Sequence, residues 1–322
     1  MGAFYMFRGS ALPQPGGNSY PALMFMSQSR SHPVPIDNLP PQWKSRLAIC
    51  FLTAKWLDWA APQTNDQFLN TFAAFPATFV FCLFVLMIFT LDHPALPMLG
   101  VMAGLVCNAM PDLHPYLLPW DMPAMFFFTA AFLAYRKKCW AILALVVLPG
   151  AVIKETVLLG AFFFLAAPWK WWVRIGTILA LAAASQIIVK SFTPAGASLS
   201  WAVHLGKFWD NLYPTTLLKL WPDIFANAGG LILLFWCLIR KRDWVLSLVV
   251  VLFVLGLKYT EIGSGLYMPG RPPYTEFRDW SELLPLCWIM ISEILLSPAP
   301  AKAEFAAGQV RLPDKNRLVA RK

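Results

Sequence analysis

Long apolar stretches recur along this chain from Phe68 to Leu296, and they limit its fold more than any other feature of the sequence. An apolar stretch of about 20 residues, wound as an α-helix, matches the roughly 30 Å hydrocarbon core of a bilayer. Backbone groups in lipid must find hydrogen-bond partners within their own segment, which favours helices, and the stretches lack the polar–apolar alternation of barrel strands. With 58% of its residues hydrophobic and 13% charged, the chain is predicted to be an all-α, polytopic integral membrane protein.

Nine segments of the chain are expected to cross the membrane as helices. They are residues 68–90, 94–110, 117–135, 139–153, 156–169, 172–190, 216–239, 244–258 and 280–297. The transmembrane helical domain thus covers residues 68–297. Ahead of it, the Pro-, Gly- and Ser-rich residues 1–41 are expected to be irregular, whereas residues 42–60 are too charged to span and suit an interfacial helix. A basic tail follows over residues 298–322.

Basic clusters between the apolar stretches set the expected orientation, because Lys and Arg accumulate in cytoplasmic loops. These clusters are Arg136-Lys137-Lys138, Lys170 with Arg174, Arg240-Lys241-Arg242 and the C-terminal tail. All of them can face the cytoplasm only if residues 139–169 form a short helical hairpin instead of one span. Pro149-Gly150 supplies a break within that stretch. We expect a cytoplasmic C-terminus and, with nine crossings, an external N-terminus.

The formal net charge of +9 does not point to nucleic acid. The lysines and arginines form short clusters between apolar stretches, which is the pattern that sets membrane topology. The six cysteines show no CxxC spacing, so no metal site is expected from them. No glycine-rich phosphate loop and no DxD motif is present, which argues against a nucleotide-sugar donor. No organic cofactor is expected, and a divalent metal requirement is left open.

Charged residues gather on the outer face once the chain is oriented in this way. Asp121 ends the connection before the third span, and Lys154 with Glu155 occupies the tip of the hairpin. Each arm of that hairpin has about 14 residues, or about 21 Å of helix, so the tip should lie below the membrane surface. The loop that enters the last span adds Arg271, Glu276, Arg278, Asp279 and Glu282. Ionisable residues within a membrane are functional candidates by default.

Each of these features also has a structural explanation. Asp121 is placed to cap the helix that follows it. Lys154 and Glu155 can form an ion pair that holds the hairpin, with Glu155 favoured by a helix N-terminus. Arg278 can pair with a neighbouring acid as a latch within its loop. The functional and structural interpretations therefore stand side by side at this stage.

Three stretches of the sequence carry a resemblance to a known class of proteins. They read PYLLPWDMPAMFFFTAAFLAYRKK, IKETVLLGAFFFLAAP and TEFRDWSELLPL. They resemble a group of bacterial multi-spanning proteins that have Tyr-x-Asp-x-Pro before an aromatic span, Arg/Lys-Glu-Thr at a hairpin tip and Glu-x-Arg before Leu-Pro. That group is similar in outline to GT-C class glycosyltransferases, and the resemblance covers about residues 42–296. The chain departs from it in the place of Tyr116 and in lacking a first span like theirs.

The resemblance implies an enzyme of the bacterial inner membrane. It would transfer a sugar from a polyprenyl-phosphate carrier to an acceptor at the extracytoplasmic face, with membrane lipid and the carrier as its partners. Asp121 or Glu155 would then serve as the catalytic base that takes the proton of the acceptor hydroxyl. The expected substrate-binding residues, which would surround the carrier phosphate and the sugar, are Lys154, Arg271, Glu276 and Arg278.

Two other classes of function compete with this one. The first is a non-catalytic structural or accessory subunit of a membrane complex, in which residues 1–41 would wrap a protein partner. The second is a transporter, which would show matched broken helices in two halves of the chain. Only the break near residues 149–156 is evident. The glycosyltransferase-like enzyme is the function we expect, with the accessory subunit as the alternative.

Overall fold

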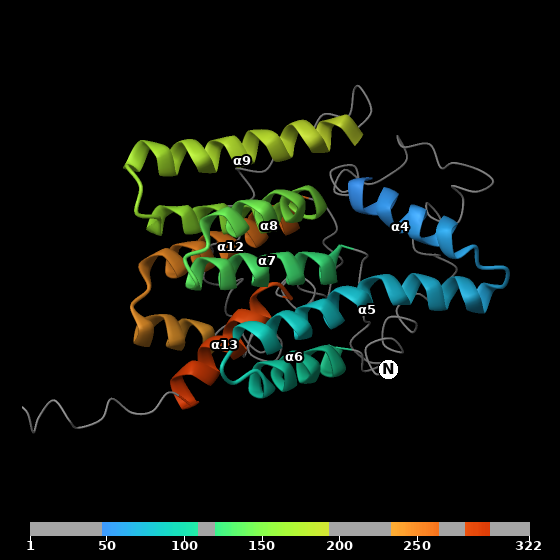
Figure 1. The fold of residues 1–322 in the computed structure, drawn as a ribbon, viewed down its shortest axis with the longest axis horizontal. Helices are drawn as coiled ribbons and strands as arrows, with labels where there is room; N and C mark the ends of the chain where they lie inside the picture. Colours follow the sequence, from blue (N-terminus) through green and yellow to red (C-terminus); the bar gives the residue numbers. More distant parts are fainter. Residues whose placement is uncertain (1–46, 109–119, 193–232, 264–280, 297–322) are drawn as a thin grey trace, which may run out of the picture.

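The computed structural model describes residues 47–108, 120–192, 233–263 and 281–296 (Figure 1). Every regular element in these residues is helical, so the expected all-α class is confirmed for them. The elements are α4 (Leu47–Ala60), α5 (Asn65–Thr90), α6 (Ala95–Asn108), α7 (Asp121–Arg136), α8 (Trp140–Ile153), the 3₁₀ helix η3 (Glu155–Ala166), α9 (Trp171–Phe192), α12 (Trp244–Gly263) and α13 (Leu283–Leu296). Residues 233–241 are also helical.

The helices lie where the sequence predicted them, but most are short. Each expected span, where the structure describes it, is helical, with ends that differ by a few residues. Two helices are long and apolar enough to cross a membrane, Asn70–Thr90 within α5 and Trp171–Phe192, and the other apolar helices have 10–17 residues. A 14-residue α-helix is about 21 Å long, which is less than the hydrocarbon core. The described residues thus support two spans, and the count of nine stays a prediction.

The segment expected to lie in the membrane interface contains α4. This helix buries Ile49, Thr53 and Leu57 along one face, whereas Phe51 and Trp59 are exposed. Residues four apart lie on the same face of an α-helix, which accounts for the buried row of Ile49, Thr53 and Leu57. The indole Nε1 of Trp56 donates to the Thr71 carbonyl at 2.9 Å and joins α4 to α5. Residues 1–41 and 298–322 lie outside the described residues.

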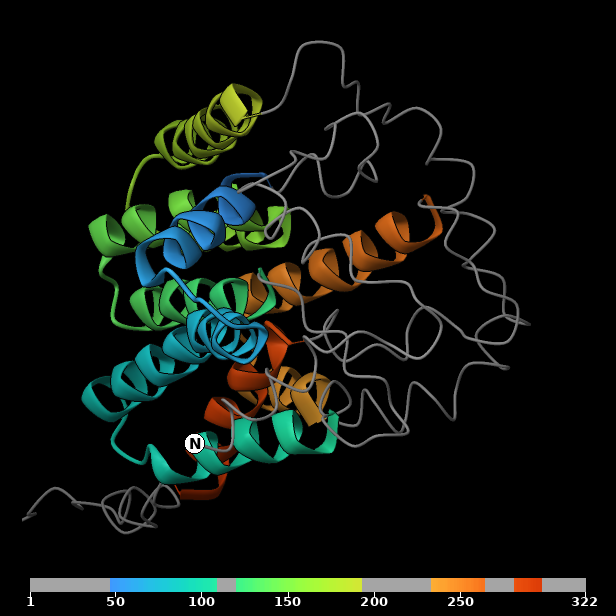
Figure 2. The ribbon, with the colours of Figure 1, turned by 90° about the vertical axis from the view of Figure 1, so that its right-hand side faces the viewer.

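Helix α7 forms the centre of the described helices. It lies between α8 and α5, with α9 beyond α8, and α13 lies between α7 and α6 (Figures 1 and 2). Twelve of its sixteen residues are buried. Phe128 and Phe132 fill the core, while small side chains such as Ala131 let neighbours approach closely, as is typical of helix packing in membranes. A Cβ added to Gly160 of η3 would lie 3.3 Å from the Cβ of Ala131, so no larger residue fits there without movement.

The stretch from 139 to 169 doubles back on itself. Lys154 is the single residue between α8 and η3, and its backbone is extended, with φ −149° and ψ 127°. Trp140 begins α8 and Trp169 follows η3, yet the centroids of their rings are only 6.0 Å apart. Helices whose far ends meet in this way are antiparallel. The hairpin therefore has Lys154 at its tip and a pair of tryptophans at its open end.

The second arm of the hairpin is an unusually long 3₁₀ helix. Runs of this helix beyond four residues are uncommon, and η3 has 12. With three residues per turn, side chains at every third position lie in line. Two such rows are buried, namely Val157, Gly160 and Phe163 in one and Ala161, Phe164 and Ala167 in the other. The period of three thus packs two adjacent rows of η3 against α7, α8 and α9.

Candidate functional site

Three charged side chains meet at the tip of the hairpin. The ammonium nitrogen of Lys154 lies 2.7 Å from Oε1 of Glu282 and 3.2 Å from Oδ1 of Asp121. The side chains are 5%, 0% and 1% exposed, respectively. Charged residues are almost never buried to this degree unless they are paired. We call these three residues the hairpin-tip cluster.

Each member of the hairpin-tip cluster stands at the end of a helix. Asp121 is the first residue of α7, where a carboxylate interacts favourably with the positive end of the helix dipole. Lys154 is fixed from both sides, because its N–H donates to the Gly150 carbonyl at 2.9 Å and its carbonyl accepts from the Val157 N–H at 3.1 Å. Glu282 directly precedes α13. Chain segments far apart in the sequence are thereby joined through one ammonium group.

Two hydroxyl groups complete the surroundings of Glu282. Thr156 Oγ1 donates to Oε1 at 2.8 Å, and Ser281 Oγ donates to Oε2 at 3.2 Å. Both carboxylate oxygens of Glu282 are therefore hydrogen-bonded, and the residue is fully buried. Hydrogen bonds to charged groups are shorter and stronger than those between neutral groups. Glu282 is consequently held in place by three side-chain partners, namely Lys154, Thr156 and Ser281.

Lys154 links the two acids of the hairpin-tip cluster through one ammonium group. Charged groups buried this deeply depend on their pairing, because removing one partner leaves the other charge buried. Lys154 directs two of its three N–H donors at carboxylates. Its amine is thus arranged to hold Asp121 and Glu282.

The structure brings together some of the residues expected from the sequence. Asp121 and Lys154 meet directly, as their placement on one face implied. Glu155 is exposed, although Lys154 next to it is buried. The remaining expected residues, Arg271, Glu276 and Arg278, lie outside the described residues. In the segments that are described, no three His, Cys, Asp or Glu side chains gather as a metal site would require.

Sequence reasoning missed the role of Glu282, which it treated as one of several loop acids. The available signal was its position, directly ahead of the apolar segment that became α13. An acid directly before a helix is buried when that helix packs among its neighbours from its first residue, and a buried carboxylate needs a cation as its partner. Lys154 is the cation that the described structure supplies.

Comparison with known proteins gives no family for this chain. No protein-family model matches it, and neither a curated protein nor a solved structure matches it. The hairpin-tip cluster is therefore interpreted from its own geometry and chemistry.

Proposed function

We propose that this protein is a polytopic, glycosyltransferase-like enzyme of the bacterial inner membrane. It would transfer a sugar from a polyprenyl-phosphate carrier to an acceptor hydroxyl at the extracytoplasmic face. The observation that carries the proposal is the buried hairpin-tip cluster, in which a carboxylate at a helix N-terminus lies 3.2 Å from an ammonium group. Ionisable groups at membrane depth are rare and are functional candidates by default.

Asp121 is the proposed base of this reaction. Its carboxylate takes the proton of the acceptor hydroxyl while the hydroxyl oxygen forms a bond to the anomeric carbon. The bond from that carbon to the carrier phosphate breaks, and the phosphate oxygen leaves with the electron pair. A single base of this kind inverts the anomeric centre. The Lys154 ammonium, 3.2 Å from Oδ1 of Asp121, holds this carboxylate in place.

Lys154 and Glu282 act in this proposal as positioning residues. Glu282, held by Thr156 and Ser281, fixes the ammonium of Lys154, which in turn fixes Asp121. Binding of the carrier phosphate falls to the arginines proposed from the sequence, Arg271 and Arg278, whose guanidinium groups suit bidentate contacts with phosphate.

The proposal is tested by the variant Asp121→Asn. Asn keeps a side-chain oxygen for Lys154 but cannot accept the proton, so we expect product formation to fall by roughly 10²- to 10⁴-fold. Membranes containing the full chain are supplied with polyprenyl-phosphate-linked hexoses, one at a time, and release of free polyprenyl phosphate is measured. Asp92→Asn, which changes an exposed acid between α5 and α6, is the matched control and should retain activity. Full activity of Asp121→Asn would exclude Asp121 as the base.

A second function, that of a structural or accessory subunit, is favoured by the completeness of the pairing in the hairpin-tip cluster. Lys154 and both acids are enclosed, as an internal lock between helices would be. This function predicts stoichiometric co-purification with a partner in mild detergent, which is lost when residues 1–41 are removed. If the chain instead elutes alone as a single species and still transfers hexose, the result would support the enzyme and exclude the accessory subunit.

A further inference from the structure

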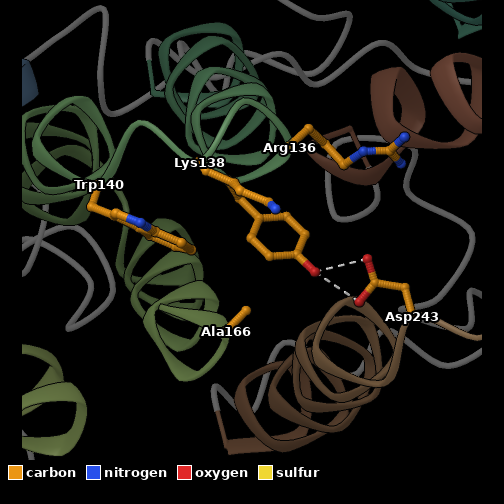
Figure 3. Close-up of a pocket in the computed structure, with 6 residues that line it drawn as sticks. Arg136, Lys138, Trp140, Ala166 and Asp243 are labelled. Carbon is orange, nitrogen blue, oxygen red and sulfur yellow. Dashed lines mark hydrogen bonds between the residues drawn. The ribbon is translucent and has the colours of Figure 1, made fainter. Parts of the chain in front are cut away.

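A cavity of about 240 Å³ lies at the open end of the hairpin, away from the hairpin-tip cluster. It is bordered by the end of α7, the start of α8, the end of η3 and the first turn of α12 (Figure 3). The residues that line it are Tyr135, Arg136, Lys138, Trp140, Ala166 and Asp243. We call it the basic cavity, and it shares no residue with the hairpin-tip cluster.

The one acid in the lining of the basic cavity is engaged with its own helix and with α7. Tyr135 donates its hydroxyl to the two oxygens of Asp243, at 2.9 and 2.8 Å. Oδ1 also accepts the Leu246 N–H at 3.0 Å, which caps the start of α12. Three hydrogen bonds spread the charge of this carboxylate over neighbouring donors. Asp243 is therefore occupied with joining α7 to α12.

The two cations in the lining, Arg136 and Lys138, differ in their partners. Arg136 donates to Oε2 of Glu293 at 2.8 Å, and Lys241, which is outside the lining, donates to the same oxygen at 3.1 Å. Lys138 is exposed, and within the described part of the chain its ammonium makes no ion pair or hydrogen bond. Figure 3 shows Lys138 with Trp140 and Asp243 in the lining of the basic cavity. Lys138 is the cation that remains for a ligand.

The backbone holds Lys138 in a conformation that a lysine seldom adopts. Its φ is +56°, and the Lys138 and Cys139 N–H groups donate to the Tyr135 and Ala134 carbonyls at 3.0 and 2.8 Å. This is the Schellman ending of a helix, whose left-handed position usually carries glycine. A side chain at such a position costs free energy, which makes a functional reason for it worth seeking. Arg242 has the same left-handed conformation, with φ +52°, directly before Asp243.

The aromatic residues around the basic cavity indicate its depth. The rings of Trp140 and Trp169 lie 6.0 Å apart at the open end of the hairpin. Exposed tryptophans follow at Trp171, Trp172 and Trp244. Tryptophan collects at the level of lipid headgroups in membrane proteins. A basic, aromatic-edged cavity at that level fits a phosphate attached to a lipid better than a free phosphate.

We propose that the basic cavity binds the phosphate of an anionic phospholipid. Lys138 contacts the phosphate, Arg136 adds positive charge at the edge, and Trp140 packs against the glycerol part of the lipid. Basic pockets between helices on the cytoplasmic side of membrane proteins bind such headgroups for the same electrostatic reasons. This site is independent of the proposed transferase activity, which depends on the opposite end of the bundle.

The test compares Lys138→Asn with Lys137→Asn. Asn tolerates a positive φ, so Lys138→Asn removes the charge and keeps the turn, while Lys137 is an exposed lysine outside the lining. The full chain in uncharged detergent is titrated with phosphatidylglycerol, and the rise in unfolding temperature gives an apparent Kd. We expect the apparent Kd to weaken about fivefold in Lys138→Asn and to stay unchanged in Lys137→Asn.

Two further titrations show whether the bound phosphate belongs to a lipid or is free in solution. Sodium phosphate and phosphatidylcholine, each at the same phosphate concentration, should leave the unfolding temperature unchanged. The proposal is overturned if sodium phosphate reproduces the full shift, or if the two lysine variants weaken phosphatidylglycerol binding equally. Lys138→Gly, in which glycine fits the left-handed turn, repeats the comparison if Lys138→Asn does not fold.

Discussion

At the scale of single residues, Lys154 joins two acids that come from opposite parts of the chain. Taking away its charge leaves Asp121 and Glu282 facing each other without the ammonium at 3.2 and 2.7 Å. Breaking a buried ion pair from one side is strongly destabilising, because the partner charge stays buried. The two acids then repel each other as well. The sequence placed the three residues on one face of the membrane, but it did not reveal that both acids pair with the same ammonium group.

We therefore predict that Lys154→Met lowers the free energy of unfolding by about 3–5 kcal/mol. Thermal unfolding of the purified chain in detergent measures the change. Lys137→Met, at an exposed lysine, serves as the control and should stay within about 0.5 kcal/mol of the native value. A Lys154→Met protein as stable as the control would show that the two carboxyl groups do not rely on the ammonium.

Replacing one of the two acids should have a smaller effect. Glu282→Gln keeps a side-chain acceptor for Thr156, and the Lys154 ammonium keeps its contact with the Asp121 carboxylate. We predict a loss of about 1–2 kcal/mol, which is smaller than the loss in Lys154→Met. The comparison uses the same unfolding measurement. A larger loss in Glu282→Gln than in Lys154→Met would contradict the charge argument.

The predictability of the site differs from residue to residue. Asp121 and Lys154 were identifiable because each stands beside an apolar segment, where a charge is unusual and easily noticed. Their contact with Glu282 depends on how α13 packs against α7, and no local pattern encodes that packing. Asp243 and Tyr135 were missed for the same reason, since they lie 108 positions apart and meet through the approach of α12 to α7.

At the scale of elements, the hairpin shows how closely two helices can approach. A Cβ added to Gly150 would lie 2.5 Å from Cγ1 of Val157 and 2.7 Å from Cβ of Phe127. The first of these atoms belongs to η3 and the second to α7. Gly176 of α9 has no neighbouring atom within 4 Å of such a Cβ. The two glycines form a natural pair for measuring the effect of packing.

We predict that Gly150→Ala destabilises the protein by about 1–3 kcal/mol, because the added methyl group forces Val157 or the backbone to move. Gly176→Ala should instead be neutral or stabilising by up to about 1 kcal/mol, since alanine favours the helix and meets no obstacle. Both variants are compared by thermal unfolding in the same detergent. Equal effects at the two positions would mean that the close approach at Gly150 does not exist.

The turn of the hairpin was predictable and its details were not. Placement of the basic clusters before Cys139 and after Trp169 on the same side of the membrane required a reversal between these two residues, and the tryptophan contact shows that reversal. The proposed break at Pro149-Gly150 was wrong, because α8 continues through both residues to Ile153. Apolar helices tolerate proline when neighbouring helices support them. Nothing in the sequence distinguishes the 3₁₀ geometry of η3 from an α-helix, since both bury apolar rows.

At the scale of the whole molecule, α9 gives the clearest indication of a lipid environment. Of its 22 residues only Ile178, Leu181 and Ser185 are buried. Its exposed surface includes Ile175, Leu179 and Ile187 in addition to two tryptophans. A continuous apolar surface of this kind is unfavourable in water and normal against lipid chains. Together with α5 it supports association with a membrane.

Labelling in intact cells tests the proposed orientation. In a chain whose six native cysteines are replaced, we expect Lys137→Cys and Lys170→Cys to react only with reagents that reach the cytoplasm. Glu155→Cys should react only from the opposite side. All three positions are exposed. Labelling of Lys137→Cys and Lys170→Cys from different sides would contradict the hairpin as a membrane element.

The extended pitch of η3 has a mechanical consequence. A 3₁₀ helix rises about 2.0 Å per residue and an α-helix about 1.5 Å, so twelve residues differ in length by about 6 Å between the two forms. A switch to the α form would draw Lys154 and Trp169 toward each other, so the ion pairs at one end or the Trp140–Trp169 contact at the other would have to break. The 3₁₀ winding of η3 therefore couples the hairpin-tip cluster to the tryptophan contact at the open end, so neither can change without the other.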